Sequence, residues 1–141
     1  MTINKRISEL LKDNYLSAEA LAKKLGLSGP TVRKWRYNTA LKLKHLLILA
    51  EYFNCSTDFL CGRTEDEGHF NKHFSADFSE RLKSLIKNDK SSVVRISKET
   101  QLSHHNFYDW LNGKPPLSSS LTALADYFRC SVDYLIGISD Y

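Results

Sequence analysis

The chain has 141 residues, of which 42% are hydrophobic and 26% are charged, as in an ordinary globular protein. No apolar run approaches the roughly 18 residues that a membrane-spanning helix needs, and the N-terminus lacks a signal-peptide stretch, so a cytoplasmic protein without membrane contact is expected. The net charge of +4 is unevenly placed: residues 1–66 hold 11 Lys and Arg against 7 Asp and Glu, whereas residues 67–141 hold 9 of each. The basic first half favours a polyanionic partner.

The first half predicts five short helices, because apolar residues recur at helical spacing and breakers fall between the runs. The first is expected over about 3–13 and the fourth over about 43–53. The second and third begin after Ser17 and Ser28, whose hydroxyls can accept a hydrogen bond from a first-turn amide. The fifth starts at Ser56 and ends at Gly62. The predicted inward residues are Ile3, Ile7, Leu10, Leu11, Leu21, Leu25, Val32, Trp35, Leu46, Leu49, Ala50 and Phe53.

Residues 64–77 are polar and are predicted to be a linker between a first domain, residues 1–63, and a second domain, residues 78–141. The three cysteines lie within apolar helical patterns and are interpreted as reduced core residues. One alternative is a zinc site made of Cys55, Cys61, His69 and His73. The gap between the two cysteines is longer than zinc sites usually have, so no metal or other cofactor is expected.

The second half repeats the first at an offset of 75 residues. Residues 1–66 align with residues 76–141 without a gap, and 18 of the 66 positions are identical. The repeat predicts helices over about 78–88, after Ser92, after Ser103, over about 119–128, and from Ser131 to Gly137. The corresponding inward residues are Phe78, Leu82, Leu85, Ile86, Ile96, Phe107, Trp110, Leu121, Leu124, Ala125 and Phe128. Both tryptophans are interpreted as core residues because each falls where the third helix meets the domain interior.

A tight turn separates the second and third helices in the segment LAKKLGLSGPTVRKW, residues 21–35. Gly26 can take a positive φ there at no steric cost, and Ala22 is small enough to let the two helices cross closely. With the closing segments LAEYFNCSTDFLCG and LADYFRCSVDYLIG, this order of motifs resembles the Cro/repressor-type (XRE) helix-turn-helix family in both copies. The resemblance implies an all-α fold with two tandem five-helix lambda-repressor-like domains.

The resemblance implies that the third helix of each copy enters the major groove of double-stranded DNA. In the first copy Arg33 and Lys34 would read base edges, and Thr31 would contact a phosphate or a thymine methyl group. The remaining DNA-binding candidates of this copy are Ser28, Arg36, Asn38, Thr39, Lys42 and Lys44. In the second copy the candidates are Ser103, His104, His105, Asn106 and Tyr108.

The sequence departs from the family pattern in two features, and one further residue is unfavourable for DNA binding. The phosphate-contacting Gln that is common at the start of the second helix is Ala18 in one copy and Val93 in the other. The turn Gly is Gln101 in the second copy, where a positive φ costs on the order of 1 kcal/mol. Asp109 on the second recognition helix would repel phosphate.

The family resemblance implies a transcriptional regulator, expected to be a repressor of phage or mobile-element type. Motifs of catalytic sites are absent from the sequence, so no enzymatic activity is expected. An alternative is a protein-interaction module, similar to an antitoxin or antirepressor, with reduced DNA binding. A homodimer and a regulatory protein partner are both compatible with the sequence, and the second copy is either an auxiliary reader or a dimerisation module.

Overall fold

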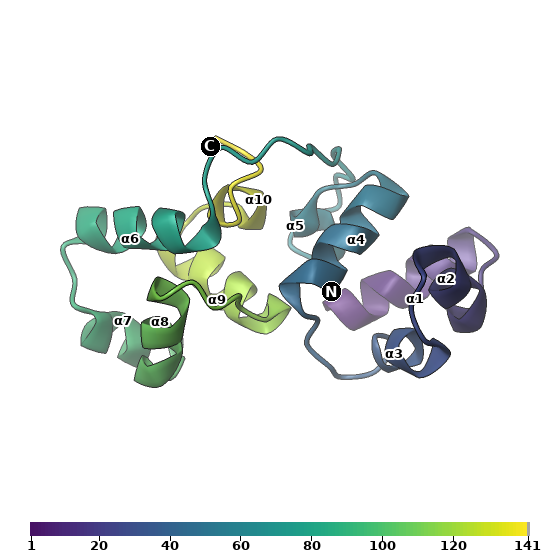
Figure 1. The fold of residues 1–141 in the computed structure, drawn as a ribbon, viewed down its shortest axis with the longest axis horizontal. Helices are drawn as coiled ribbons and strands as arrows, with labels where there is room; N and C mark the ends of the chain where they lie inside the picture. The colour runs from purple at the N-terminus through teal and green to yellow at the C-terminus, as the bar shows by residue number, and fades with distance from the viewer. Residues whose placement is uncertain (141) are drawn as a thin grey trace. The chain divides into compact units, whose positions relative to one another are not determined.

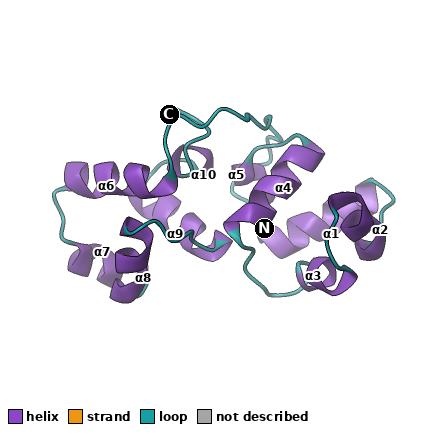
Figure 2. Ribbon diagram, viewed as in Figure 1, coloured by secondary structure: helices purple, strands orange, loops and turns teal. Residues whose placement is uncertain are grey.

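The structure is a computed structural model that describes residues 1–140. Over these residues it contains ten helices and no strand, so the predicted all-α fold class is confirmed. Figure 2 shows helices and loops along this part of the chain. The chain divides into two compact units, Met1–Phe70 (unit 1) and Asn71–Tyr141 (unit 2). Within the described part of the chain, no helix has both the length and the apolar character that a membrane crossing requires. The last residue of the predicted second domain, Tyr141, lies outside the described residues.

Unit 1 consists of five helices joined by short connections (Figure 1). Serine side chains begin three of them as predicted: Ser17, Ser28 and Ser56 each accept a hydrogen bond from the amide three residues further on. Thr2 caps the first helix in the same way. The helices are α1 (Ile3–Asp13), α2 (Ala18–Leu25), α3 (Gly29–Lys34), α4 (Leu43–Phe53) and α5 (Thr57–Leu60).

The core of unit 1 matches most of the predicted apolar stripes. Trp35 is only 3% exposed, which confirms its assignment to the core. Full burial of a Leu or Ile side chain stabilises a fold by roughly 1.5–3 kcal/mol, so these residues dominate the stability of the unit. The buried predicted residues are Ile7, Leu11, Leu21, Val32, Leu46, Leu49 and Ala50, and those that are only half-buried are Ile3, Leu10, Leu25 and Phe53.

The most buried charged side chain of unit 1, Arg6, was not predicted to be in the interior. Arg6 is 3% exposed, and its Nε donates to the carbonyl of Phe59 at 2.8 Å while Nη2 donates to the carbonyl of Thr64 at 2.9 Å. The guanidinium also lies 3.9 Å from the centroid of the Phe59 ring. Burial of a charge is tolerated only when its donors are satisfied, and here they tie α1 to α5 and to the segment that follows it.

Unit 2 also has five helices, and each begins 75 residues after its counterpart in unit 1. Ser92, Ser103 and Ser131 occupy the N-cap positions, as the repeat predicts, and Asp77 caps the first helix of this unit. Trp110 is buried at 4% exposure. The helices are α6 (Phe78–Asp89), α7 (Val93–Thr100), α8 (His104–Leu111), α9 (Ser118–Phe128) and α10 (Val132–Leu135).

The predicted linker, residues 64–77, is divided between the two units. In unit 1, the Ser56 amide donates to the carbonyl of Glu67 at 2.8 Å. In unit 2, the Ser75 amide donates to the carbonyl of Gly137 at 2.8 Å. Both ends of this segment are therefore hydrogen-bonded to the unit in which they lie.

Cys55 and Cys61 are buried as predicted, whereas Cys130 is only half-buried. Among residues 1–140, no group of three or more His, Cys, Asp or Glu side chains is arranged to hold a metal ion. The zinc alternative therefore has no support in this part of the chain.

Candidate nucleic-acid interface

Helices α2 and α3 form the helix-turn-helix of unit 1. Helix α2 ends at Leu25. The C-cap residue Gly26 takes φ of +71°, and the amide of Leu27 donates back to the carbonyl of Ala22 at 2.9 Å. Ala22 and Val32 are buried, which allows the two helices to pack closely at the turn. The predicted role of Gly26 is confirmed, and this packing leaves the opposite side of α3 exposed.

The hydroxyl groups of Ser28 and Thr31 lie together at the start of α3. The Ser28 Oγ accepts from the Thr31 amide at 3.3 Å, and the two hydroxyl oxygens are 2.7 Å apart. Ser28 is exposed and Thr31 is half-buried. Both expected DNA contacts thus stand next to the exposed face of α3, with their hydroxyls already oriented by the cap.

Arg33, the principal predicted base reader, is engaged in an ion pair with Glu19 on α2. The Arg33 Nη1 lies 2.6 Å from the Glu19 Oε1. The hydrogen bond from Arg33 lowers the pKa of the Glu19 carboxyl below its ordinary value, so that this group stays ionised. No sequence motif marks Glu19 as part of this surface. Its partner lies 14 residues away, and only the crossing of α2 over α3 brings the two side chains together.

A dense run of positive charge follows Arg33. Residues 33–44 contain five Lys and Arg and no Asp or Glu. The exposed side chains of this run are Arg33, Lys34, Arg36, Lys42 and Lys44, and the polar candidates Asn38 and Thr39 are exposed as well. Lys44 lies in α4, which begins at Leu43, and Lys42 directly precedes this helix.

Lys42 and Lys44 occupy positions that helix stability does not favour. Lys42 is the N-cap of α4, where it makes no side-chain capping hydrogen bond, and Lys44 is in the first turn. The N-terminus of a helix carries partial positive charge and prefers anionic side chains. The two lysines therefore add to the partial positive charge at the N-terminus of α4. This arrangement suits the binding of an external anion.

Asn4 holds the loop between α3 and α4. Its Nδ2 donates to the carbonyl of Trp35 at 2.8 Å and to that of Thr39 at 2.9 Å. The loop that presents the basic side chains is therefore tied to α1. This role of Asn4 has no sequence signal, because the acceptors are backbone atoms more than 30 residues away.

His45 links the basic run to the core. Its ring lies 5.3 Å from the Trp35 ring, and it is 9% exposed. Burial lowers the pKa of His45 below the ordinary value of 6.5, and the charges of Lys44 and Lys42 lower it further. The neutral imidazole is thus the form that the folded unit prefers.

Acidification is expected to destabilise unit 1 through His45. Because the folded-state pKa is lowered, the unfolded chain takes up the proton first. The stabilisation is complete above the unfolded pKa of about 6.5 and is lost as the pH falls through the folded-state value. In a Trp110→Phe background, urea unfolding followed by Trp35 fluorescence should therefore give a lower free energy at about pH 5 than at about pH 7. His45→Gln should flatten this dependence, and an equal decrease in that variant would contradict the assignment.

The counterpart surface of unit 2 carries different chemistry. Ser103 caps α8, His104, His105 and Tyr108 are exposed, and Asn106 is half-buried. Residues 108–119, which correspond to the basic run, contain one Lys and one Asp. This part of unit 2 therefore lacks the excess positive charge of unit 1.

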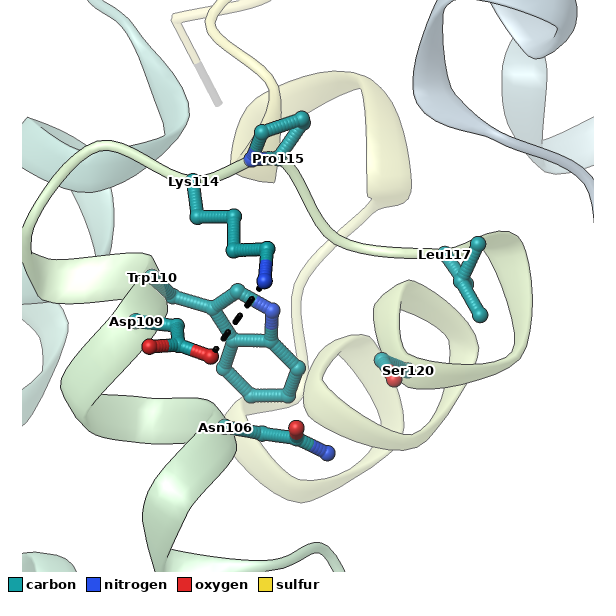
Figure 3. Close-up of a pocket in the computed structure, with 7 residues that line it drawn as sticks. All are labelled: Asn106, Asp109, Trp110, Lys114, Pro115, Leu117 and Ser120. Carbon is teal, nitrogen blue, oxygen red and sulfur yellow. Dashed lines mark ion pairs between the residues drawn. The ribbon is translucent and has the colours of Figure 1, made fainter.

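A small cavity adjoins α8 in unit 2. Its volume is about 240 Å³, and Figure 3 shows Asp109 and Lys114 on one side of the Trp110 ring, with Ser120 and Leu117 on the opposite side. The Lys114 Nζ lies 3.7 Å from an Asp109 carboxylate oxygen. Ser120 occupies the position that corresponds to His45, so a small hydroxyl replaces the imidazole ring next to this tryptophan. The partners of Asp109 partly offset the repulsion that the sequence predicts for it.

Comparison with known proteins identifies the first unit. The family model of the Cro/C1-type HTH DNA-binding domain matches residues 6–66. Residues 6–66 are therefore a Cro/C1-type HTH domain, and a domain of this class indicates a DNA-binding transcription regulator. No curated protein and no solved structure matches the chain.

Proposed function

We propose that this protein is a transcriptional repressor of phage or mobile-element type that reads double-stranded DNA through unit 1. The concentration of positive charge on the exposed part of α3, the following loop and the start of α4 carries this proposal. Five cations over 12 residues, with no carboxylate among them, match a phosphate backbone, and α3 supplies side chains for base edges. A repressor that occupies a promoter needs neither catalysis nor a cofactor, and we propose neither.

We propose that unit 2 is a second domain of the same fold that contributes little to DNA affinity. The equal offset of all five helices and the shared serine caps support the common fold. The balance of charge over residues 108–119 supports the weaker role. Unit 2 would then act as an auxiliary reader or as a dimerisation module, and its recognition positions differ from those of unit 1.

A second function has one specific observation in its favour. Unit 2 exposes Tyr108 at 66%, Val94 at 55% and Leu117 at 47%. Exposed aromatic and aliphatic side chains are typical of protein interfaces. Such side chains would suit a protein-interaction module, similar to an antitoxin or antirepressor. A full chain that shows no retention on heparin and no gel shift with genomic fragments would favour this function.

Selection of bound sequences from random DNA, followed by the same selection with Arg33→Ala, tests the main proposal. The loss of a bidentate guanine contact should cost about 1–3 kcal/mol on the best site and relax the preference at one or two base pairs. The fold should be retained because the Arg33 side chain is exposed. Arg95→Ala is the matched control, since Arg95 is an exposed arginine paired with Glu99 at 3.2 Å in unit 2. Identical preferences in parent and Arg33→Ala would refute base reading by Arg33.

A further inference from the structure

The ion pair between Arg33 and Glu19 is not explained by the stability of the fold. The two side chains are 51% and 57% exposed, and exposed ion pairs contribute little because water and salt screen them. A carboxylate next to the DNA-reading arginine also opposes the binding of a polyanion. The pair therefore has an electrostatic cost at the proposed interface without a matching gain in stability.

Gly29 provides the space in which this pair forms. It is the first residue of α3 and is not among the glycines with positive φ, so its backbone conformation does not require glycine. A Cβ at this position would lie 3.3 Å from the Arg33 Nη1 and 3.7 Å from the Glu19 Cγ. A Cβ here would be in close contact with the guanidinium and would require it to shift by a few tenths of an ångström.

The corresponding positions in unit 2 differ at all three places. His104, Val94 and Tyr108 stand where unit 1 has Gly29, Glu19 and Arg33. Unit 1 therefore has both the basic run and the arrangement of glycine, carboxylate and guanidinium, whereas unit 2 has neither. This correspondence links the arrangement to the reading surface and not to the five-helix fold.

We propose that Glu19 is a positioning residue that holds the Arg33 guanidinium in one orientation over Gly29 and thereby sets base preference at the expense of affinity. The inference rests on the proposed function, because it requires Arg33 to read a base. Arginine has a long flexible stem, and its planar fork recognises guanine only when the fork is correctly oriented. The Glu19 carboxylate restricts the orientation of the Arg33 guanidinium and so reduces the number of base edges that Arg33 can contact.

Two substitutions in the full chain separate the charge of Glu19 from its positioning role. Glu19→Gln removes the charge while keeping the size of the side chain. It should bind non-specific DNA about two- to fivefold more tightly at low salt and relax the preference at the base pair assigned to Arg33 by about fivefold or more. Gly29→Ala should relax the same preference by displacing the guanidinium, without tighter non-specific binding, because no charge changes. Asp13→Asn, at the exposed end of α1, is the charge-matched control and should leave the preference unchanged.

The outcomes distinguish this inference from the proposed function. If Arg33→Ala relaxes the preference but Glu19→Gln and Gly29→Ala do not, Arg33 reads DNA without help from Glu19 and the inference is overturned. The same holds if Glu19→Gln only tightens binding at every sequence. If the parent binds no DNA, the proposed function fails and the inference fails with it. Circular dichroism of each variant verifies that the fold is retained.

Discussion

Gly137→Ala is expected to destabilise unit 2 by about 3–5 kcal/mol, enough to unfold a large fraction of a domain of this size. Gly137 has φ of +86°, and a Cβ added to it would overlap the carbonyl oxygen of Ala76. The backbone of Ala76 would have to move. Its neighbour Ser75 would then lose the hydrogen bonds that its amide and hydroxyl donate to the Gly137 carbonyl at 2.8 and 3.2 Å.

The displacement should also reach α6. The Ser75 hydroxyl accepts a hydrogen bond from Arg81 at 3.0 Å, and Asp77 caps this helix through the amide of Glu80 at 2.8 Å. A shift of residues 75–77 therefore weakens the start of the helix as well as the close approach at Gly137. Strain at Gly137 is in this way coupled to the stability of α6.

Urea unfolding measures this effect in a Trp35→Phe background, where Trp110 is the only tryptophan and reports on unit 2. Gly113→Ala is the matched control. Gly113 has φ of +97° and nothing within 4 Å of an added Cβ, so only the backbone strain of about 1–2 kcal/mol is expected. Equal losses in the two variants would show that the contact with Ala76 has no energetic importance.

The double substitution Lys42→Ala and Lys44→Ala is expected to weaken DNA binding by about 10- to 100-fold at low salt, and to do so equally for all sequences. Each lost phosphate contact should reduce the slope of log K against log salt by about 0.9, so the double variant should lose nearly two units. Binding isotherms over a series of salt concentrations give this slope directly.

The same double substitution should increase the stability of unit 1. Removal of two cations from the start of α4 relieves repulsion with the helix dipole, which is worth a few tenths of a kcal/mol per residue. Lys83→Ala with Lys87→Ala, two exposed lysines of α6, removes the same charge from unit 2 and serves as the control. An unchanged salt slope in the Lys42 and Lys44 variant, or an equal change in the control, would refute the phosphate contacts.

Periodicity and capping residues were sufficient to predict the helices. Residue spacing determines which side chains share a helix face, and a Ser N-cap acts on an amide only a few residues away, so both signals are local. The structure confirms helix starts after Ser17, Ser28, Ser92 and Ser103. The expectation that a turn residue with positive φ is glycine has a limit. Gln101 takes φ of +61° at the position where unit 1 has Gly26. No atom lies within 4 Å of a Cβ at Gly26, so the corresponding turn of unit 1 is sterically open.

The DNA-binding residues remain predictions, but the structure shows the surroundings in which they would act. The family resemblance implied that Arg33, Lys34, Lys42 and Lys44 face DNA, and all four side chains are exposed. The pairing of Arg33 with Glu19, the hydrogen bonds of Asn4 to the loop and the tilted ring contact between His45 and Trp35 come from contacts between elements.

The sequence by itself determined the helices, most of the two cores and the unequal distribution of charge, because each depends on residue type and on spacing within a few turns. Only the tertiary structure decided that Arg6 is buried among backbone carbonyls, that Gly137 must lack a side chain, and that Glu19 reaches Arg33 on α3. These three contacts join residues 53, 61 and 14 positions apart. Contacts over such separations depend on how the helices cross, and no local pattern of residues records that geometry.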